Sequence, residues 1–185
     1  MASCYISTGY TLDCRTSSTG GLKTAWFLGG ANNEITGYTV TAGAVTAIGG
    51  TGEWFQFQLP KQSASLTETL GINTTSQSVT FQPSLVLNLP KLNTTLRDVV
   101  VDLISQNTVF ALVEDNNNRY WLVFLDNGGM VTASSVQTGQ AYTDLNGASA
   151  LTISGGEPTS IREVVVPVGQ TIADVFTAGG FTFQS

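Results

Sequence analysis

The chain has 185 residues, of which 42% are hydrophobic and only 11% are charged, and its net charge is −6. Globular proteins average about 25% charged residues, so this surface must consist largely of Thr, Ser, Asn, Gln and Gly. The absence of histidine excludes Ser-His-Asp and Cys-His catalysis and histidine-based zinc sites. The seven Lys and Arg residues are scattered, which argues against tight nucleic-acid binding through many phosphate contacts.

The first segment runs from Cys4 to Cys14 and alternates like a strand around Thr8-Gly9. A hairpin there would allow a disulfide between the two cysteines, whereas two reduced thiols are the alternative. The start at Met1 lacks the basic and apolar regions of a signal peptide, so we expect no cleaved export signal. No apolar run approaches the roughly 18 residues that span a membrane, so we expect no membrane partner.

Most of the remaining chain has the period-two pattern of β-strands, with Val, Thr, Phe, Tyr and Ile in short runs between Gly, Asn and Pro. In chain order the predicted strands are residues 22–28, 35–48, 54–59, 78–89, 108–114, 119–125, 130–136, 148–154, 160–168 and 181–183. The second of these is expected to be a hairpin that turns near Ala42-Gly43, and Gly49–Gly52 is expected to end it as a flexible tip. The polar segment 63–77 is either an exposed arm or a long strand with a hydroxylated outer face.

One helix is predicted, at about residues 94–106. Its apolar residues fall on one stripe at helical spacing: Leu96, Val99, Val100, Leu103 and Ile104. Asn93 or Thr94 can cap it, and Asp98 is expected in the first turn, where a negative charge suits the helix dipole. A short helix or a loop is expected within residues 169–179.

These elements predict a mainly β protein, an antiparallel β sandwich or barrel with one flanking amphipathic α-helix. We expect a single domain over residues 1–185. Within it, residues 1–53 would supply N-terminal strands, residues 54–166 the central part and residues 167–185 a C-terminal segment.

The carboxylate residues form no clear catalytic or metal-binding motif. Asp98 and Asp102 share a helix side and could in principle bind a metal or act as paired acids, but a solvated helix face is the favoured interpretation. Glu114-Asp115 adjoin at a turn. A calcium-binding loop that starts at Asp144 would need Glu at its twelfth position, which is Gly155. Gly49–Gly52 is not followed by the Lys and the helix of a phosphate-binding loop. We therefore expect no enzyme, no metal, no cofactor and no catalytic residue.

The three tryptophans, Trp26, Trp54 and Trp121, stand inside strand patterns. An exposed sugar-binding platform is one use of such residues, and packing in a core or an interface is the commoner one.

A resemblance to a known family rests on the order of elements in the second half of the chain. The matching segments are Leu85–Leu92 before the helix, the hairpin Val109–Asp115 with Arg119–Asp126, then Thr138–Gly147, Leu151–Ser154 and Glu157-Pro158. This order resembles tail-tube and related virion proteins of tailed bacteriophages over residues 54–166. The ring protein of type VI secretion is similar in fold.

The resemblance implies a β barrel or sandwich flanked by a helix. It also implies rings, usually hexameric, that stack into a hollow tube through which DNA passes without tight binding. The expected partners are copies of the same chain and other virion tail proteins, and the expected location is the virion, after assembly in the host cytoplasm. A charge-poor surface and a net negative subunit agree with this function. A capsid decoration protein or a receptor- or carbohydrate-binding β-sandwich module is the alternative.

Overall fold

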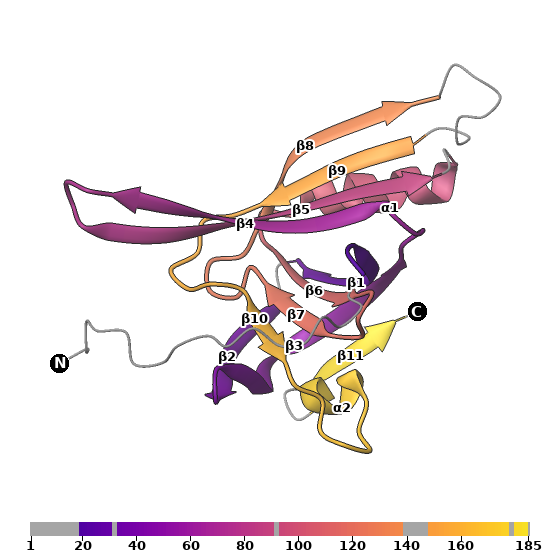
Figure 1. Cartoon of the computed structure of the whole chain (residues 1–185). Coiled ribbons are helices and arrows are strands. Elements are labelled where there is room, and N and C mark those ends of the chain that lie inside the picture. Colours follow the sequence, from indigo (N-terminus) through magenta and orange to yellow (C-terminus); the bar gives the residue numbers. More distant parts are fainter. Residues whose placement is uncertain (1–18, 31–32, 91–92, 139–147, 178–179, 185) are drawn as a thin grey trace.

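The computed structural model describes residues 19–30, 33–90, 93–138, 148–177 and 180–184. It consists of two β-sheets and two helices, which confirms the predicted mainly β fold with a flanking helix (Figure 1). The predicted pairing of Cys4 with Cys14 and the loop that starts at Asp144 lie outside the described residues.

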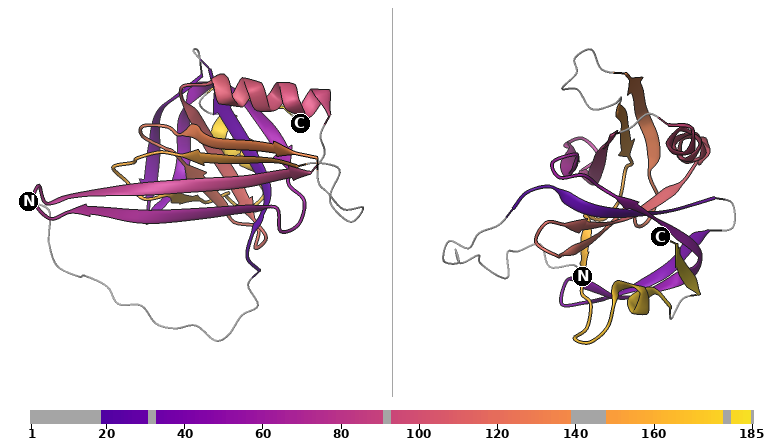
Figure 2. Two further views of the ribbon diagram at one scale, coloured as in Figure 1. Left: turned by 90° about the horizontal axis from the view of Figure 1, so that it is seen from above. Right: turned by 90° about the vertical axis from the view of Figure 1, so that its right-hand side faces the viewer.

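The first sheet closes on itself. Its strands are β1 (Leu22–Gly29), β2 (Glu34–Thr41), β3 (Ala44–Gln58), β6 (Val109–Asp115), β7 (Tyr120–Val123), β10 (Arg162–Val164) and β11 (Phe181–Gln184). Because β3 pairs with both β1 and β10, the path β1–β6–β7–β10–β3 returns to β1 and forms a small barrel. β2 and β11 are attached to β3 (Figure 2). Closure leaves this part of the molecule with few free strand edges.

The second sheet stays open. It consists, in spatial order, of β4 (Ala64–Asn73), β5 (Ser78–Pro90), β9 (Ala148–Ser154) and β8 (Met130–Gln137). The two outer strands, β4 and β8, each pair on one side only within the described residues. β9 reaches along β5 only as far as Ser84, so the β4–β5 hairpin continues beyond its neighbour (Figure 1).

Helix α1 (Thr94–Ser105) lies beside the second sheet and helix α2 (Ile172–Thr177) lies at the barrel. The side-chain oxygen of Asn93 accepts a hydrogen bond from the backbone N–H of Leu96 at 2.8 Å and caps α1, as predicted. The prediction for Asp98 was wrong. The helix begins at Thr94, so that its first turn ends before Asp98 and holds no acidic residue.

Two hydrophobic cores share the barrel wall. Along β1, Ala25 and Phe27 face one core, and Trp26 and Leu28 face the other, because successive side chains of a strand point to opposite sides. The inner core fills the barrel around Trp54 and includes side chains of α2. The outer core lies between the barrel, the open sheet and α1.

The segment Gly49–Gly52 does not form a flexible tip. It lies within β3, which continues from Ala44 to Gln58 without a break. A Cβ atom on Gly50, where φ is +154°, would overlap the carbonyl oxygen of Glu34 and the ring of Phe181. The glycine therefore permits close packing of strands rather than a turn. The turn near Ala42-Gly43 is as predicted, whereas the strand expected over residues 160–168 is only the three residues of β10.

Candidate assembly surfaces

A two-stranded arm projects from the open sheet. We define the arm as residues 69–82, the part of the β4–β5 hairpin beyond its pairing with β9. Its root is held by two backbone hydrogen bonds between Phe81 and Glu157, at 2.9 and 2.8 Å. At its tip, the side-chain oxygen of Asn73 accepts hydrogen bonds from the N–H groups of Thr75 and Ser76. The arm fulfils both alternatives predicted for residues 63–77, since it is an exposed arm and also a strand with a hydroxylated face.

The arm has one apolar and one polar face. The register places Leu70 opposite Phe81 and Ile72 opposite Val79, and all four side chains share a face. Leu70, Ile72 and Val79 are 54%, 62% and 48% exposed. The other face carries the pairs Thr69–Gln82, Gly71–Thr80 and Asn73–Ser78. A hairpin of two strands is marginally stable alone in water, so an exposed apolar face on it points to a partner.

The open sheet has unprotected edges. Seven of the eight residues of β8 are exposed, and the strand contains neither a charged residue nor a proline. Native proteins usually block a free edge with Lys, Pro, a bulge or a covering segment, because its unpaired backbone groups can pair with another chain. β8 has one bulge, between Val131 and Ala133, and lies next to helix α1, yet most of its residues remain exposed.

The outward face of the open sheet is uncharged. The four strands contain one charged residue, Glu68. Its carboxylate accepts hydrogen bonds from the Ser160 hydroxyl at 2.6 Å and the Ile161 N–H at 2.8 Å, so it is tied to the segment before β10. The face turned away from the core carries small, hydroxyl and amide side chains instead: Ser65, Thr67, Ser84, Val86, Asn88, Ala150 and Thr152.

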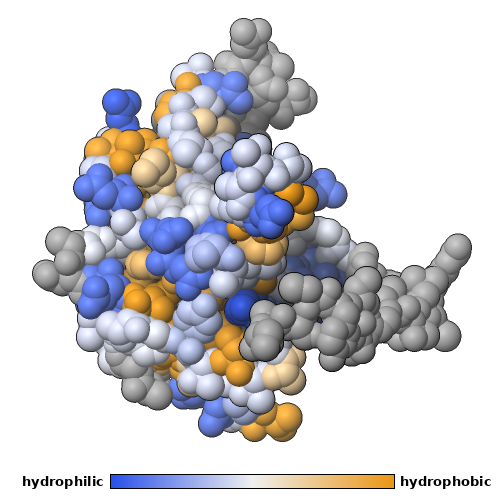
Figure 3. Space-filling model, turned by 90° about the vertical axis from the view of Figure 1, so that its left-hand side faces the viewer, coloured by the Kyte–Doolittle hydropathy of each residue, from blue (hydrophilic) through white to orange (hydrophobic). Residues whose placement is uncertain are grey.

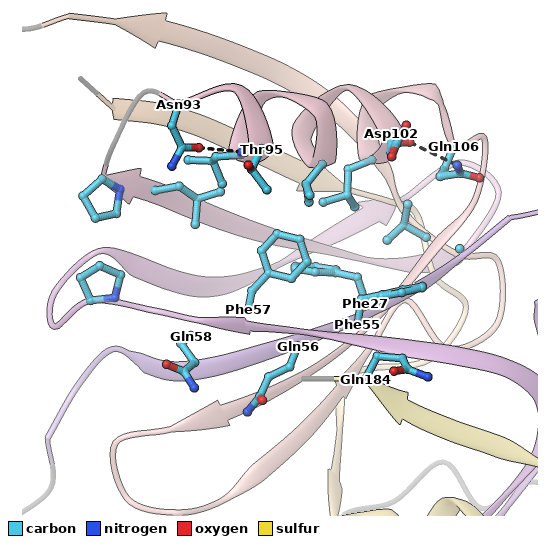
Figure 4. Close-up of a pocket in the computed structure, with 18 residues that line it drawn as sticks. Phe27, Phe55, Gln56, Phe57, Gln58, Asn93, Thr95, Asp102, Gln106 and Gln184 are labelled. Atoms are coloured by element: carbon cyan, nitrogen blue, oxygen red, sulfur yellow. Dashed lines mark hydrogen bonds between the residues drawn. The ribbon is translucent and has the colours of Figure 1, made fainter. Parts of the chain in front are cut away.

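An apolar groove lies between α1 and the last part of β3. Its volume is about 780 Å³. Phe27 and Phe57 meet edge to face with ring centroids 5.0 Å apart, and Figure 4 shows both rings on the side of the strands that faces α1. Leu96 and Val99 line the helix side, and Asp102 is the only charged residue among the described residues of the lining. The groove is therefore able to take an uncharged, partly apolar segment.

The two carboxylate pairs singled out in the sequence lie in different surroundings, one on the exposed side of α1 and one at the end of β6. Asp98 and Asp102 are both exposed on α1. Glu114 forms an ion pair with Lys23, with Oε1 and Nζ 2.9 Å apart, and this hydrogen bond and the negative charge raise the pKa of Lys23. Among the described residues, no three side chains of the metal-binding types come together.

Asp115 stabilises the turn between β6 and β7. Its Oδ1 atom accepts hydrogen bonds from the N–H groups of Asn117 and Arg119, at 2.7 and 3.0 Å. Partial burial raises the pKa of Asp115, but the two backbone donors and the indole of Trp121 outweigh that effect and keep it below the ordinary value.

Glu157 is the most deeply buried carboxylate among the described residues, at the junction between the barrel and the open sheet. It is 2% exposed, and its oxygens accept hydrogen bonds from the N–H groups of Asp126 and Asn127, the nearest at 2.8 Å. Burial raises the pKa of Glu157 in spite of these donors, and the nearby charge of Asp126 adds to the increase. Its backbone pairs with Phe81 and its carboxylate binds the turn at Asp126 and Asn127, so Glu157 links the arm root to the turn before β8.

The tryptophans do not form an exposed platform. Trp26 and Trp54 are buried in the inner core, and Trp121 is half-buried against the outer core. Trp54 stacks on Phe183 with an angle of 12° between the ring planes, and it meets Phe176 edge to face. This arrangement agrees with the packing role predicted for them.

The sequence indicated the arm but not the groove or the unprotected edges. The groove combines residues from β1, β3, β5, α1 and β11 that are far apart in the chain, so no local pattern marks it. The missing charges of residues 130–137 and 148–154 were a usable signal for the open sheet. The surface seen from the side to which the arm points mixes apolar and polar residues (Figure 3).

The comparisons with known proteins found no match for the chain among protein-family models, curated proteins or solved structures. Among the described residues, the helices are too short or too polar to cross a bilayer.

Proposed function

We propose that the chain is a self-assembling virion structural protein, the tail tube subunit whose rings stack around a conduit for DNA. The observation that carries the proposal is the open second sheet, which has an uncharged outward face and free edges at β4 and β8. Assembly, rather than catalysis, is the function that these surfaces support.

Edge pairing supports ring formation. β4 and β8 lie on opposite sides of the sheet, so β8 of one copy can pair with β4 of the next. Such a head-to-tail interface uses two different surfaces, and repetition of it gives a ring when the rotation closes. The ring would remove the free edges in the same way that a barrel does.

The outward face of the open sheet supports a role as the lining of a conduit. A continuous sheet of many copies would present Thr67, Asn88 and Thr152 with no Lys or Arg among them. A basic residue there would hold phosphates and slow DNA, whereas hydroxyl and amide groups of a net negative subunit would not. We infer passage of DNA without tight binding.

The experiment compares the wild type with an edge variant by size-exclusion chromatography and negative-stain electron microscopy. The variant carries Ala133→Lys and Ser135→Lys, at β8 positions that pair with Thr152 and Ala150 on the outward face. We expect rings or tubes from the wild type and monomers with unchanged circular dichroism from the variant, because lysines on an edge oppose pairing. Val168→Lys, at a fully exposed loop position, is the control and should assemble.

Wild-type protein that stays monomeric at every concentration would contradict the proposal. Discrete trimers without rings or tubes would favour the alternative of a capsid decoration or receptor-binding protein.

A further inference from the structure

We infer that the arm of each subunit docks in the groove beside α1 of a second copy in the next ring, so that these two surfaces stack the rings. This inference rests on the proposed function and adds the axial contact to it. Both surfaces belong to the described residues, and the apolar face of the arm is made of side chains, whereas the pairing of β4 with β8 uses the backbone groups at the strand edge.

The arm projects along the strands of the open sheet, which points to a contact between rings rather than within one. Hydrogen bonds between strands run across the strands, so rings built by edge pairing grow perpendicular to them. The arm continues along β4 and β5, past the last residue that pairs with β9, Ser84. From Glu68 to the tip at Asn73 it extends about 16 Å, at roughly 3.3 Å per residue. It therefore projects out of the plane in which edge pairing adds subunits.

The groove lies at the opposite end of the molecule. In Figure 1 the arm points to the left, whereas α1, the end of β11 and the last part of β3 lie on the right. The groove is built from these elements, including Phe57, Val99 and Gln184. Two different surfaces at opposite ends produce a head-to-tail contact that does not close, and such contacts generate filaments.

The chemistry of the two surfaces matches. Residues 69–82 contain no charged side chain, and the part of the groove lining that the structure describes contains one, Asp102. The apolar face of the arm, with Leu70, Ile72 and Val79, fits a groove floored by Phe27 and Phe57 (Figure 4). Neither surface has to desolvate an ion pair when they meet, and burial of apolar area supplies the driving force.

Continuity with the core also favours a second copy as the occupant. Leu66 and Leu85 pair on the same face as Leu70 and Phe81, and Leu85 is fully buried in the outer core. The apolar face of the arm thus continues the row of side chains that faces the outer core, beyond the point where that core ends. In a second copy of the chain, the same kind of apolar surface is accessible at the groove.

Two single substitutions test the contact from its two sides, in the full-length chain. Ile72→Asp places a charge on the apolar face of the arm, and its control, Asn73→Asp, places one on the polar face while retaining the oxygen that accepts the turn hydrogen bonds. Val99→Asp places a charge in the groove, and its control, Val101→Asp, places one at an exposed position of α1 outside the groove lining.

We expect Ile72→Asp and Val99→Asp to give single rings without tubes, while both controls give tubes of wild-type length in electron micrographs. A mixture adds a stricter test. Rings of Ile72→Asp retain an intact groove and rings of Val99→Asp retain intact arms, so one good interface forms between them and the next one fails. Analytical ultracentrifugation of the mixture should therefore show particles of twice the mass of a ring.

The outcomes separate the two proposals. Normal tubes from Ile72→Asp and Val99→Asp, or a mixture without ring pairs, would overturn the docking of arm in groove and leave ring formation by edge pairing in place. Wild-type protein that never forms rings would overturn both proposals.

Discussion

The closed barrel and the open sheet are both built from β-strands, but they differ in the number of charged residues that these strands carry. The barrel strands carry the charged residues Lys23, Glu34, Glu53, Glu114, Asp115, Arg162 and Glu163, whereas the open sheet carries only Glu68. Five strands of the barrel also close on one another, so among the described residues only the attached β2 and β11 keep a free edge there, whereas the open sheet leaves β4 and β8 free. The difference suits a barrel that stays in water and, under the proposed function, an open sheet that other copies cover.

The largest expected effect is on the barrel. Trp54 is fully buried among Phe176, Phe181 and Phe183, so Trp54→Ala should remove about 3–5 kcal/mol from the free energy of unfolding. Urea denaturation of dilute, monomeric protein measures this loss. Val168→Ala, at an exposed position, is the control and should change little. A Trp54→Ala protein as stable as the wild type would mean that the inner core does not support the fold.

A smaller loss is expected where β3 packs against its neighbours. Gly50→Ala forces a Cβ against the Glu34 carbonyl oxygen and Phe181 and strains a positive φ, so we expect a loss of about 1–3 kcal/mol. Gly37→Ala is the matched control, because the space around Gly37 is open. Equal melting temperatures of the two variants would show that β3 can shift at no cost.

Glu157 should give a pH dependence at the junction of the two regions. Its folded-state pKa is raised, so the folded protein holds the proton more tightly than the unfolded chain. The contribution of Glu157 to stability therefore increases as the pH falls from above its raised pKa towards the ordinary value of 4.5. Glu157→Gln lacks this gain. Acidification should therefore raise the free energy of unfolding of the wild type relative to that of the variant. Parallel pH profiles would contradict the raised pKa.

The sequence predicted the local elements well because each had its own signal. Alternation marked the strands, spacing marked α1, and Asn93 marked its cap. Closure of the barrel was not predictable, since it depends on pairing of β3 with β1 and also with β10, which lies more than a hundred residues further along the chain. Gly50 was misjudged for the same reason, because glycine at a close strand contact and glycine in a turn look alike in sequence. The groove has no local signal at all.

The smallest effect on folding is expected from the arm. Ile72→Ala removes an exposed side chain that contacts no core, so the free energy of unfolding of the monomer should change by less than about 0.5 kcal/mol. The same substitution should shorten the tubes, because the side chain is buried only after docking. Denaturation and electron microscopy of one preparation measure both results. A large loss of monomer stability would mean that the arm belongs to the fold rather than to assembly.

The contrast between the closed barrel and the open sheet is tested most directly by amide hydrogen exchange at increasing protein concentration, followed peptide by peptide. The account predicts that protection of β4, β8 and the arm rises steeply as particles form, while protection of the barrel strands β1 and β6 stays constant. Fast exchange of β8 and the arm at every concentration, with no particle larger than the 19.5 kDa chain, would contradict it.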